Sequence, residues 1–267
     1  MATIGEIIAR INQRTAEIRA RVGDTRSDQI LGTEGRDRLF GTFGDDVILG
    51  FGGDDIISGG FGDDFLDGGD GRDEISGGFG NDYILGGNGN DRLFGGAGDD
   101  LVFGGAGNDL MDGSIGGDVL FGGDGNDNIT GGVNGDPDGP EEFFVDFLVG
   151  GNGSDTLNGF GGGTGTFERD ILIGGGEVDE NGFIVDESGD GVRDIFVLGN
   201  NRGPFYAVAG DDDYALILDF EIGIDQLQLS PAVNHVFTPD QGDTLIYANV
   251  ATGPDLIGVL VGVSFNG

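Results

Sequence analysis

The sequence predicts an all-β repeat fold in which short strands alternate with glycine-rich turns. Glycine supplies 60 of the 267 residues, about three times its usual share, and it favours tight turns over helix interiors. Residues 32–130 divide into eleven uninterrupted nonapeptides, and one position of each nonapeptide is always apolar. A fixed period of this kind indicates equal structural units that stack on one another.

The eleven nonapeptides are constant at four positions. Positions 1 and 4 are always glycine, as in GGNGNDRLF at 86–94, whereas position 2 also admits Thr, Phe and Ser. Position 6 is always aspartate: Asp37, Asp46, Asp55, Asp64, Asp73, Asp82, Asp91, Asp100, Asp109, Asp118 and Asp127. Position 8 is always apolar: Leu39, Ile48, Ile57, Leu66, Ile75, Ile84, Leu93, Val102, Met111, Leu120 and Ile129.

Each constant position has a structural reason. Positions 1 to 6 are predicted to form a turn, and positions 7 to 9 a short strand whose middle side chain faces the core. The aspartate then stands at the end of a turn, beside glycine carbonyls, and such oxygen atoms suit a hard cation. A dinucleotide-binding glycine loop is excluded because no glycine turn precedes a segment of helix length.

These residues match GGxGxDxUx and resemble the nonapeptide of the RTX (repeats-in-toxin, haemolysin-type) family, a calcium-binding repeat. The resemblance implies a right-handed parallel β-roll with two nonapeptides per coil and Ca²⁺ between turns eighteen residues apart. The eleven repeats contain nine such pairs, beginning with Asp37 and Asp55, so roughly nine or more ions are expected.

The resemblance also implies the ligands of each ion, which are carboxylates from both turns and carbonyls from positions 2 and 4. The expected carbonyl ligands are Gly60, Gly62, Gly69, Gly71, Gly78, Gly80, Gly87, Gly89, Gly96, Gly98, Gly105, Gly107, Gly123 and Gly125.

Charge narrows the range of partners. The chain carries 49 acidic and 12 basic residues, all of the latter arginine, for a net charge of -37. Repulsion between like charges argues against nucleic acid or anionic membranes as partners and favours cations. There is no cysteine, so disulfides are excluded. No apolar run is long enough to predict a transmembrane segment.

Beyond residue 130 the repeat continues with insertions after residues 131, 159 and 174. Its further metal-binding aspartates are predicted to be Asp146, Asp155, Asp170 and Asp194. Residues 186–194 resemble the start of an EF-hand loop, but Val197 stands where that loop needs glutamate, which excludes a true EF-hand. An additional loop calcium site and an Asx-rich turn both remain open for this stretch.

The two outer faces of the roll differ in polarity. Outward positions 7 and 9 are apolar at four of fourteen places on one face and at thirteen of fourteen on the other. Since so large an apolar patch should not stay in water, that face is predicted to be covered. An amphipathic helix with a stripe from Ile4 to Val22 could cover its own roll or a neighbour's, or the apolar faces of two chains could pack together.

Three regions are therefore expected: an N-terminal amphipathic helix and linker at 1–30, the roll at 31–199, and a C-terminal β cap and secretion region at 200–267. Strands are predicted at 214–220, 226–229, 243–250 and 255–263. The run YALILDFEIGIDQLQLS resembles the segment that closes RTX rolls, especially in cyanobacterial RTX-type proteins. The resemblance implies an uncleaved signal for type I secretion, and the N-terminus shows no Sec-type signal pattern. We therefore expect an extracellular or cell-surface location.

Function follows from charge and spacing. Facing carboxylates repel until Ca²⁺ neutralises them, so ion binding should supply folding free energy. The main hypothesis is a secreted, non-catalytic structural, surface or adhesive protein. One alternative is a layer or filament subunit that self-associates through the apolar face. Surface polysaccharide is a further candidate partner, through a loop at 134–142.

The other alternative is a Ca²⁺-dependent enzyme acting on polysaccharide. The segment before Gly32 is too short for a catalytic domain, and HExxH is absent. A Ser-His-Asp catalytic site would have to use His235, the single histidine, and would need Ser230 or Ser264 nearby as the nucleophile. We therefore expect no catalytic residues.

Overall fold

The structure is a computed structural model that describes residues 28–133, 146–160, 169–175, 177–178, 184–186, 191–200, 203–204, 214–250 and 253–263. These residues form strands and turns without a helix, which confirms the all-β prediction. The predicted N-terminal helix lies outside them. The described part of the chain contains no helix with the length and apolarity needed to cross a membrane.

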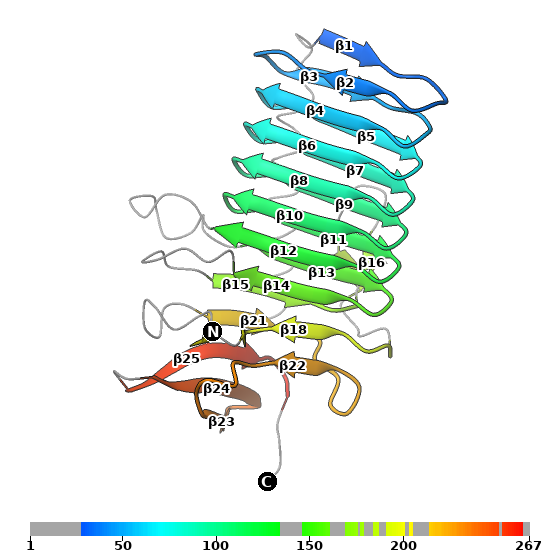
Figure 1. Cartoon of the computed structure of the whole chain (residues 1–267). Coiled ribbons are helices and arrows are strands. Elements are labelled where there is room, and N and C mark those ends of the chain that lie inside the picture. Colours follow the sequence, from blue (N-terminus) through cyan, green and yellow to red (C-terminus); the bar gives the residue numbers. More distant parts are fainter. Residues whose placement is uncertain are drawn as a thin grey trace.

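Along the repeats, successive strands alternate between two sheets that lie back to back, and the strands within each sheet pair in parallel, so the chain winds as a β-roll (Figure 1). The twelve-stranded sheet contains, in spatial order, β1 (Asp28–Leu31), β3 (Asp46–Leu49), β5 (Phe65–Asp70), β7 (Tyr83–Asn88), β9 (Leu101–Ala106), β11 (Val119–Asp124), β13 (Phe147–Asn152), β15 (Arg169–Ile173), β21 (Tyr214–Ile217), β25 (Gly253–Leu260), β24 (Asp243–Val250) and β23 (His235–Asp240). The nine-stranded sheet contains β2 (Arg38–Phe40), β4 (Ile56–Phe61), β6 (Glu74–Phe79), β8 (Arg92–Ala97), β10 (Leu110–Ile115), β12 (Asn128–Val133), β14 (Thr156–Phe160), β18 (Ile195–Val197) and β22 (Gln226–Gln228). Two small pairs join β16 (Glu177–Val178) to β17 (Ile184–Asp186) and β19 (Gly199–Asn200) to β20 (Gly203–Pro204).

Each coil contains two nonapeptides, as predicted. In the regular part of the roll, a residue pairs with the residue eighteen positions further on, as Phe65 does with Tyr83. The insertions keep this register. The N–H of Asp118 donates to Asp146, 28 positions away, a separation of one eighteen-residue coil plus the ten inserted residues.

The strands are longer than the sequence predicted. From β4 to β13 they run from position 7 of one repeat to position 3 of the next, as in the six residues of β5. The position 2 glycine stays within the ladder at positive φ, as Gly69 does at 93°. Glycine therefore allows the backbone to bend while its inter-coil pairing continues, so only positions 4 to 6 form the turn.

The core between the sheets is a single layer of position 8 side chains. Ile48, Leu66 and Ile84 of the twelve-stranded sheet and Leu93 of the nine-stranded sheet are fully buried in one core cluster. One inward side chain per strand suffices because the two sheets lie close together, and position 1 glycine leaves no side chain to hold them apart. At Gly59, an added Cβ would stand 2.2 Å from Asp64 Oδ2.

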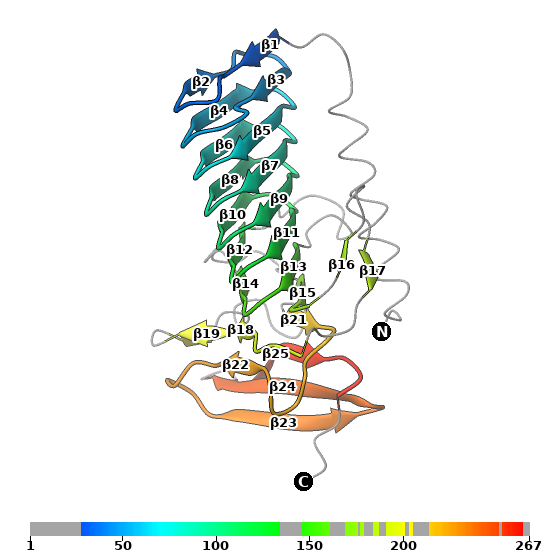
Figure 2. The ribbon, with the colours of Figure 1, turned by 90° about the vertical axis from the view of Figure 1, so that its right-hand side faces the viewer.

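The outer faces of the two sheets differ as predicted. On the twelve-stranded sheet, the outward side chains of Leu101, Val119 and Ile173 have no exposed surface. They belong to a second apolar cluster that runs from Tyr83 to Leu218. The apolar face is therefore covered over this length, and the β16–β17 pair lies on this side of the roll (Figure 2).

The C-terminal strands close one end of the roll (Figure 2). β21 and β22 still pair in parallel with β15 and β18, so the ladders extend past residue 200, where the repeat was expected to end. β25 then adds in parallel to β21, and β24 and β23 follow antiparallel. Strands near all four predicted places are present, and β23 is an additional strand that the sequence did not predict.

Candidate metal centre

The position 6 aspartates form two columns, one along each edge of the roll. In each step the N–H of one aspartate donates to Oδ1 of the aspartate on the next coil, at 2.7–3.3 Å. The first column contains Asp46, Asp64, Asp82, Asp100, Asp118, Asp146 and Asp170; the second contains Asp37, Asp55, Asp73, Asp91, Asp109, Asp127, Asp155 and Asp194. The fold thus brings together all fifteen predicted aspartates.

The second carboxylate oxygen is the unusual feature of these columns. Oδ2 is buried without a hydrogen-bond partner in Asp55, Asp64, Asp73, Asp82, Asp91, Asp100, Asp109 and Asp127. A buried carboxylate oxygen without a partner is costly. A row of cations, each held between neighbouring coils, would satisfy these atoms, so the residues fit Ca²⁺.

Backbone carbonyls approach the same edges. The position 2 carbonyl of Phe51 lies 2.1 Å from where a Cβ on Gly69 would stand, and the position 4 carbonyl of Gly71 lies 1.5 Å from where one on Gly89 would stand. These carbonyls point from one coil towards the next, whereas the aspartate Oδ1 atoms point back. Oxygen atoms from two coils therefore face the same gap, as a hard cation requires.

The first aspartates of both columns have different surroundings. Asp37 Oδ2 accepts hydrogen bonds from Thr33 N (2.6 Å) and Thr33 Oγ1 (2.8 Å). Asp46 Oδ2 is likewise bonded by Thr42 N at 2.5 Å. The threonine hydroxyls thus supply donors that glycine, the residue at position 2 of most later repeats, lacks. We expect these two carboxylates to contribute less to ion binding than those inside the columns.

A second ladder, at position 5 of the repeat, was not predicted from the sequence. The Asn81 N–H donates to Asp63 Oδ1 at 2.8 Å, and the Asp99 N–H donates to Asn81 Oδ1 at 2.7 Å. These side chains accept from the following coil, whereas position 6 accepts from the preceding one, so each turn is tied in both directions. The signal was present, because position 5 is Asp or Asn in eight of the eleven repeats.

Two carboxylates beyond residue 200 were also missed. The Asp194 N–H donates to Asp225 Oδ1 at 3.1 Å, so Asp225 extends the second column by one coil. Gly223, Asp225 and Leu227 keep the GxDxUx spacing. Asp219 accepts from Gly174 N and Gly175 N, at 2.9 and 2.8 Å. Burial raises the pKa of Asp219 to about 7.

No group of three or more His, Cys, Asp or Glu side chains converges on a point within the described residues. Cation sites here would therefore depend on carbonyls as well as on the aspartate columns. His235 Nε2 is buried without a hydrogen-bond partner, and Ser230 Oγ accepts from Ala232 N. No hydrogen bond in the described part of the chain joins His235 to Ser230. Ser264 and residues 187–190 lie outside the described residues.

In the absence of metal, burial and neighbouring carboxylates raise the pKa values of column aspartates, so these side chains stay protonated to a higher pH. Desolvation, the main cause, raises the pKa of Asp64 to about 7, of Asp73 to about 6 and of Asp82 to about 8. The pKa of Asp100 is also well above its usual range, because of burial and the charge of Asp118. Protons and Ca²⁺ should therefore compete for the same oxygen atoms.

This competition predicts opposite pH dependences with and without Ca²⁺. Because the folded-state pKa values of about 6 to 8 exceed the unfolded value of 3.8, the metal-free roll should be most stable in acid. It should lose that stability as the pH rises from the unfolded pKa of 3.8 through the folded values of about 6 to 8. The apparent Ca²⁺ affinity should instead fall about tenfold per pH unit of acidification for each proton displaced.

Denaturant unfolding in calcium-free buffer and Ca²⁺ titrations, both at pH 5 and pH 8, measure the two trends. A metal-free chain that becomes more stable from pH 5 to pH 8 would contradict the burial of these carboxylates.

The parallel coils and aspartate columns define the chain as a nonapeptide-repeat β-roll. It matches the family model for the RTX calcium-binding nonapeptide repeat (4 copies) over residues 22–50, 31–66, 49–84, 76–111, 85–120, 103–136 and 144–162. These segments together cover half of the chain. The chain therefore belongs to the RTX calcium-binding repeat family, whose repeats bind Ca²⁺.

No curated protein matches the chain. Among solved structures, it is similar to the extracellular lipase LipA from Serratia marcescens, with 18% sequence identity and a TM-score of 0.23. The match covers 91% of this chain and 39% of the lipase chain, so this chain spans well under half of the lipase's length.

Proposed function

We propose that this chain is a secreted protein whose roll folds as Ca²⁺ fills the two aspartate columns, and that its role is structural, surface or adhesive rather than catalytic. One observation carries the proposal: eight column aspartates bury an oxygen atom without a hydrogen-bond partner. Their carboxylates, with the position 2 and 4 carbonyls, would hold the ions. Ca²⁺ would supply the positive charge that a chain of net charge -37 needs in order to compact.

The environment outside the cell would then control folding. Low cytosolic Ca²⁺ would leave the chain unfolded and competent for export, and millimolar external Ca²⁺ would fold it. Type I secretion through a signal within residues 200–267 belongs to the same proposal. Self-assembly through the apolar face is less well supported, because Leu101 and Val119 on that face are already buried.

Counting bound ions tests the proposal. Equilibrium dialysis at millimolar Ca²⁺ should give roughly nine or more ions per chain, since Ca²⁺ fits each gap between consecutive column members. Mg²⁺ should not displace them, because it demands a tighter octahedral geometry. One or two ions per chain would contradict the assignment of the columns as metal ligands.

A further inference from the structure

One stretch of the nine-stranded sheet and its edge gathers arginine side chains among the acidic residues of the roll. Of the six arginines that the structure describes, four fall within residues 36–92. Arg36, Arg38, Arg72 and Arg92 are all exposed. We refer to these four residues as the arginine patch. Since the chain has 12 basic residues against 49 acidic ones, a local excess of arginine marks a surface that can attract anions.

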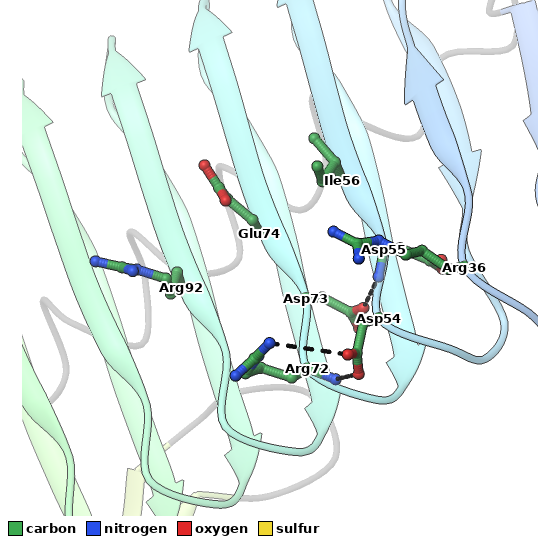
Figure 3. Close-up of a pocket in the computed structure, with 8 residues that line it drawn as sticks. All are labelled: Arg36, Asp54, Asp55, Ile56, Arg72, Asp73, Glu74 and Arg92. Carbon is green, nitrogen blue, oxygen red and sulfur yellow. Dashed lines mark hydrogen bonds and ion pairs between the residues drawn. The ribbon is translucent and has the colours of Figure 1, made fainter.

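Three members of the arginine patch line a cavity of about 240 Å³ between the coils (Figure 3). Arg36, Arg72 and Arg92 share this cavity with Asp54 and Glu74, among others. The Arg72 guanidinium lies 3.8 Å from Asp54, yet its side chain remains 70% exposed, so it can still reach a ligand. The volume is below that of a typical drug-sized pocket, and it suits one charged group or one sugar unit.

The sheet face beside the cavity repeats one motif at a fixed distance. β2 and β8 both present Arg-Leu-Phe, with Arg and Phe facing outward. Phe40, Ser58, Ser76 and Phe94 are in register across β2, β4, β6 and β8. Three strand steps place the two motifs ~14 Å apart. Two aromatic rings thus flank two hydroxyl groups, with arginines alongside.

This composition favours an acidic polysaccharide as the ligand. Guanidinium groups bind carboxylate or sulfate oxygens in a bidentate fashion. Serine hydroxyls can exchange hydrogen bonds with sugar hydroxyls. Phenylalanine rings offer an apolar surface for the C–H face of a sugar ring, and Phe40 is 61% exposed.

Ca²⁺ would control the charge of the cavity. Its three arginines face four acids, Asp54, Asp55, Asp73 and Glu74, so its formal charge without metal is -1. Asp55 and Asp73 are consecutive members of the second column. One Ca²⁺ held between them would change that charge to +1, because the ion adds two positive charges.

We propose that the arginine patch and the adjacent Phe–Ser row bind an acidic polysaccharide through its carboxylate or sulfate groups, and that they do so only in the Ca²⁺-loaded roll. This inference rests on the proposed function, because the ion that reverses the charge occupies the aspartate column.

Calorimetric titration of the full chain in millimolar Ca²⁺ tests the inference. Short oligogalacturonates supply carboxylates, dextran sulfate supplies sulfates, and unmodified dextran is the neutral control. At least one of the two anionic ligands should bind, more weakly at higher salt, and neutral dextran should not. The triple variant Arg36→Gln, Arg72→Gln, Arg92→Gln should weaken binding by tenfold or more, since each guanidinium makes charge-assisted hydrogen bonds.

The matched control is Arg193→Gln, which removes an exposed arginine near β18 and should leave affinity unchanged. Far-UV circular dichroism in Ca²⁺ shows whether each variant forms the roll. Equal binding by wild type and triple variant, equal binding of neutral dextran, or no binding by a well-folded roll would overturn this inference alone. A chain that stays unfolded in Ca²⁺ would overturn the proposed function, and this inference with it.

Discussion

Replacing Asp100 by asparagine should shift stability in opposite directions with and without Ca²⁺. The amide can keep the hydrogen bond from Asp82 N to Oδ1, which is 2.8 Å long. It puts an NH₂ group where the buried Oδ2 would face an ion, so the variant should lose about 3 kcal/mol of stability for one ion at a hundred times its dissociation constant. Without Ca²⁺ the variant should be more stable than the wild type, because asparagine avoids both a buried charge beside Asp118 and the proton uptake that would neutralise it.

Asp37→Asn is the matched control, because Asp37 is the first described member of its column and its Oδ2 is already bonded by Thr33. Its effect in Ca²⁺ should be clearly smaller than that of the Asp100 variant. Denaturant unfolding in Ca²⁺ and in chelator measures both variants. Equal losses at the two positions, or a loss in chelator for Asp100→Asn, would contradict the assignment of Oδ2 as a metal ligand.

Gly89→Ala should be among the most damaging single substitutions in the roll. Gly89 has φ of 145°, and a Cβ there would stand 1.5 Å from the carbonyl oxygen of Gly71. The positive φ alone costs about 1–3 kcal/mol for an L-residue, and the coils would also have to separate. We therefore expect a loss of about 3 kcal/mol or more, and weaker binding of Ca²⁺ in the gap that the two coils share.

The control for Gly89→Ala is another glycine at position 4 of the repeat, Gly44. A Cβ on Gly44, also at position 4, would meet no atom within 4 Å, and Gly44 is not among the positive-φ glycines. Gly44→Ala should therefore change stability little. Unfolding of both variants in saturating Ca²⁺, followed by circular dichroism, makes the comparison. A tolerated Gly89→Ala would show that the coils are not stacked as closely as described.

The sequence predicted the structure best at positions where every repeat requires the same residue type for the same local reason. Aspartate at position 6 and an apolar residue at position 8 recur because every coil meets the same neighbours. The core layer therefore followed from spacing, and the columns followed from spacing together with the two nonapeptides per coil that the family resemblance implied. The ten-residue insertion before Asp146 could be placed outside the ladder for the same reason, since Asp146 keeps its place beside Asp118.

Other features depend on neighbours eighteen or more residues away, which local patterns describe poorly. Strands extend to position 3 because positive-φ glycines such as Gly69 remain paired between coils, whereas glycine alone suggests a turn. The coil that contains Asp225 lacks the first glycines of the repeat and was therefore assigned to the cap. Arg36 and Arg72 line one cavity only because two complete coils separate them.

The central claim is that Ca²⁺ drives the chain into the roll, and far-UV circular dichroism during a Ca²⁺ titration tests it most directly. We predict a cooperative gain of β signal with Ca²⁺ and no comparable gain in a parallel titration with Mg²⁺. A spectrum that is already β-rich in chelator at neutral pH and does not change on adding Ca²⁺ would contradict the claim. The aspartate columns would then be buried without driving folding.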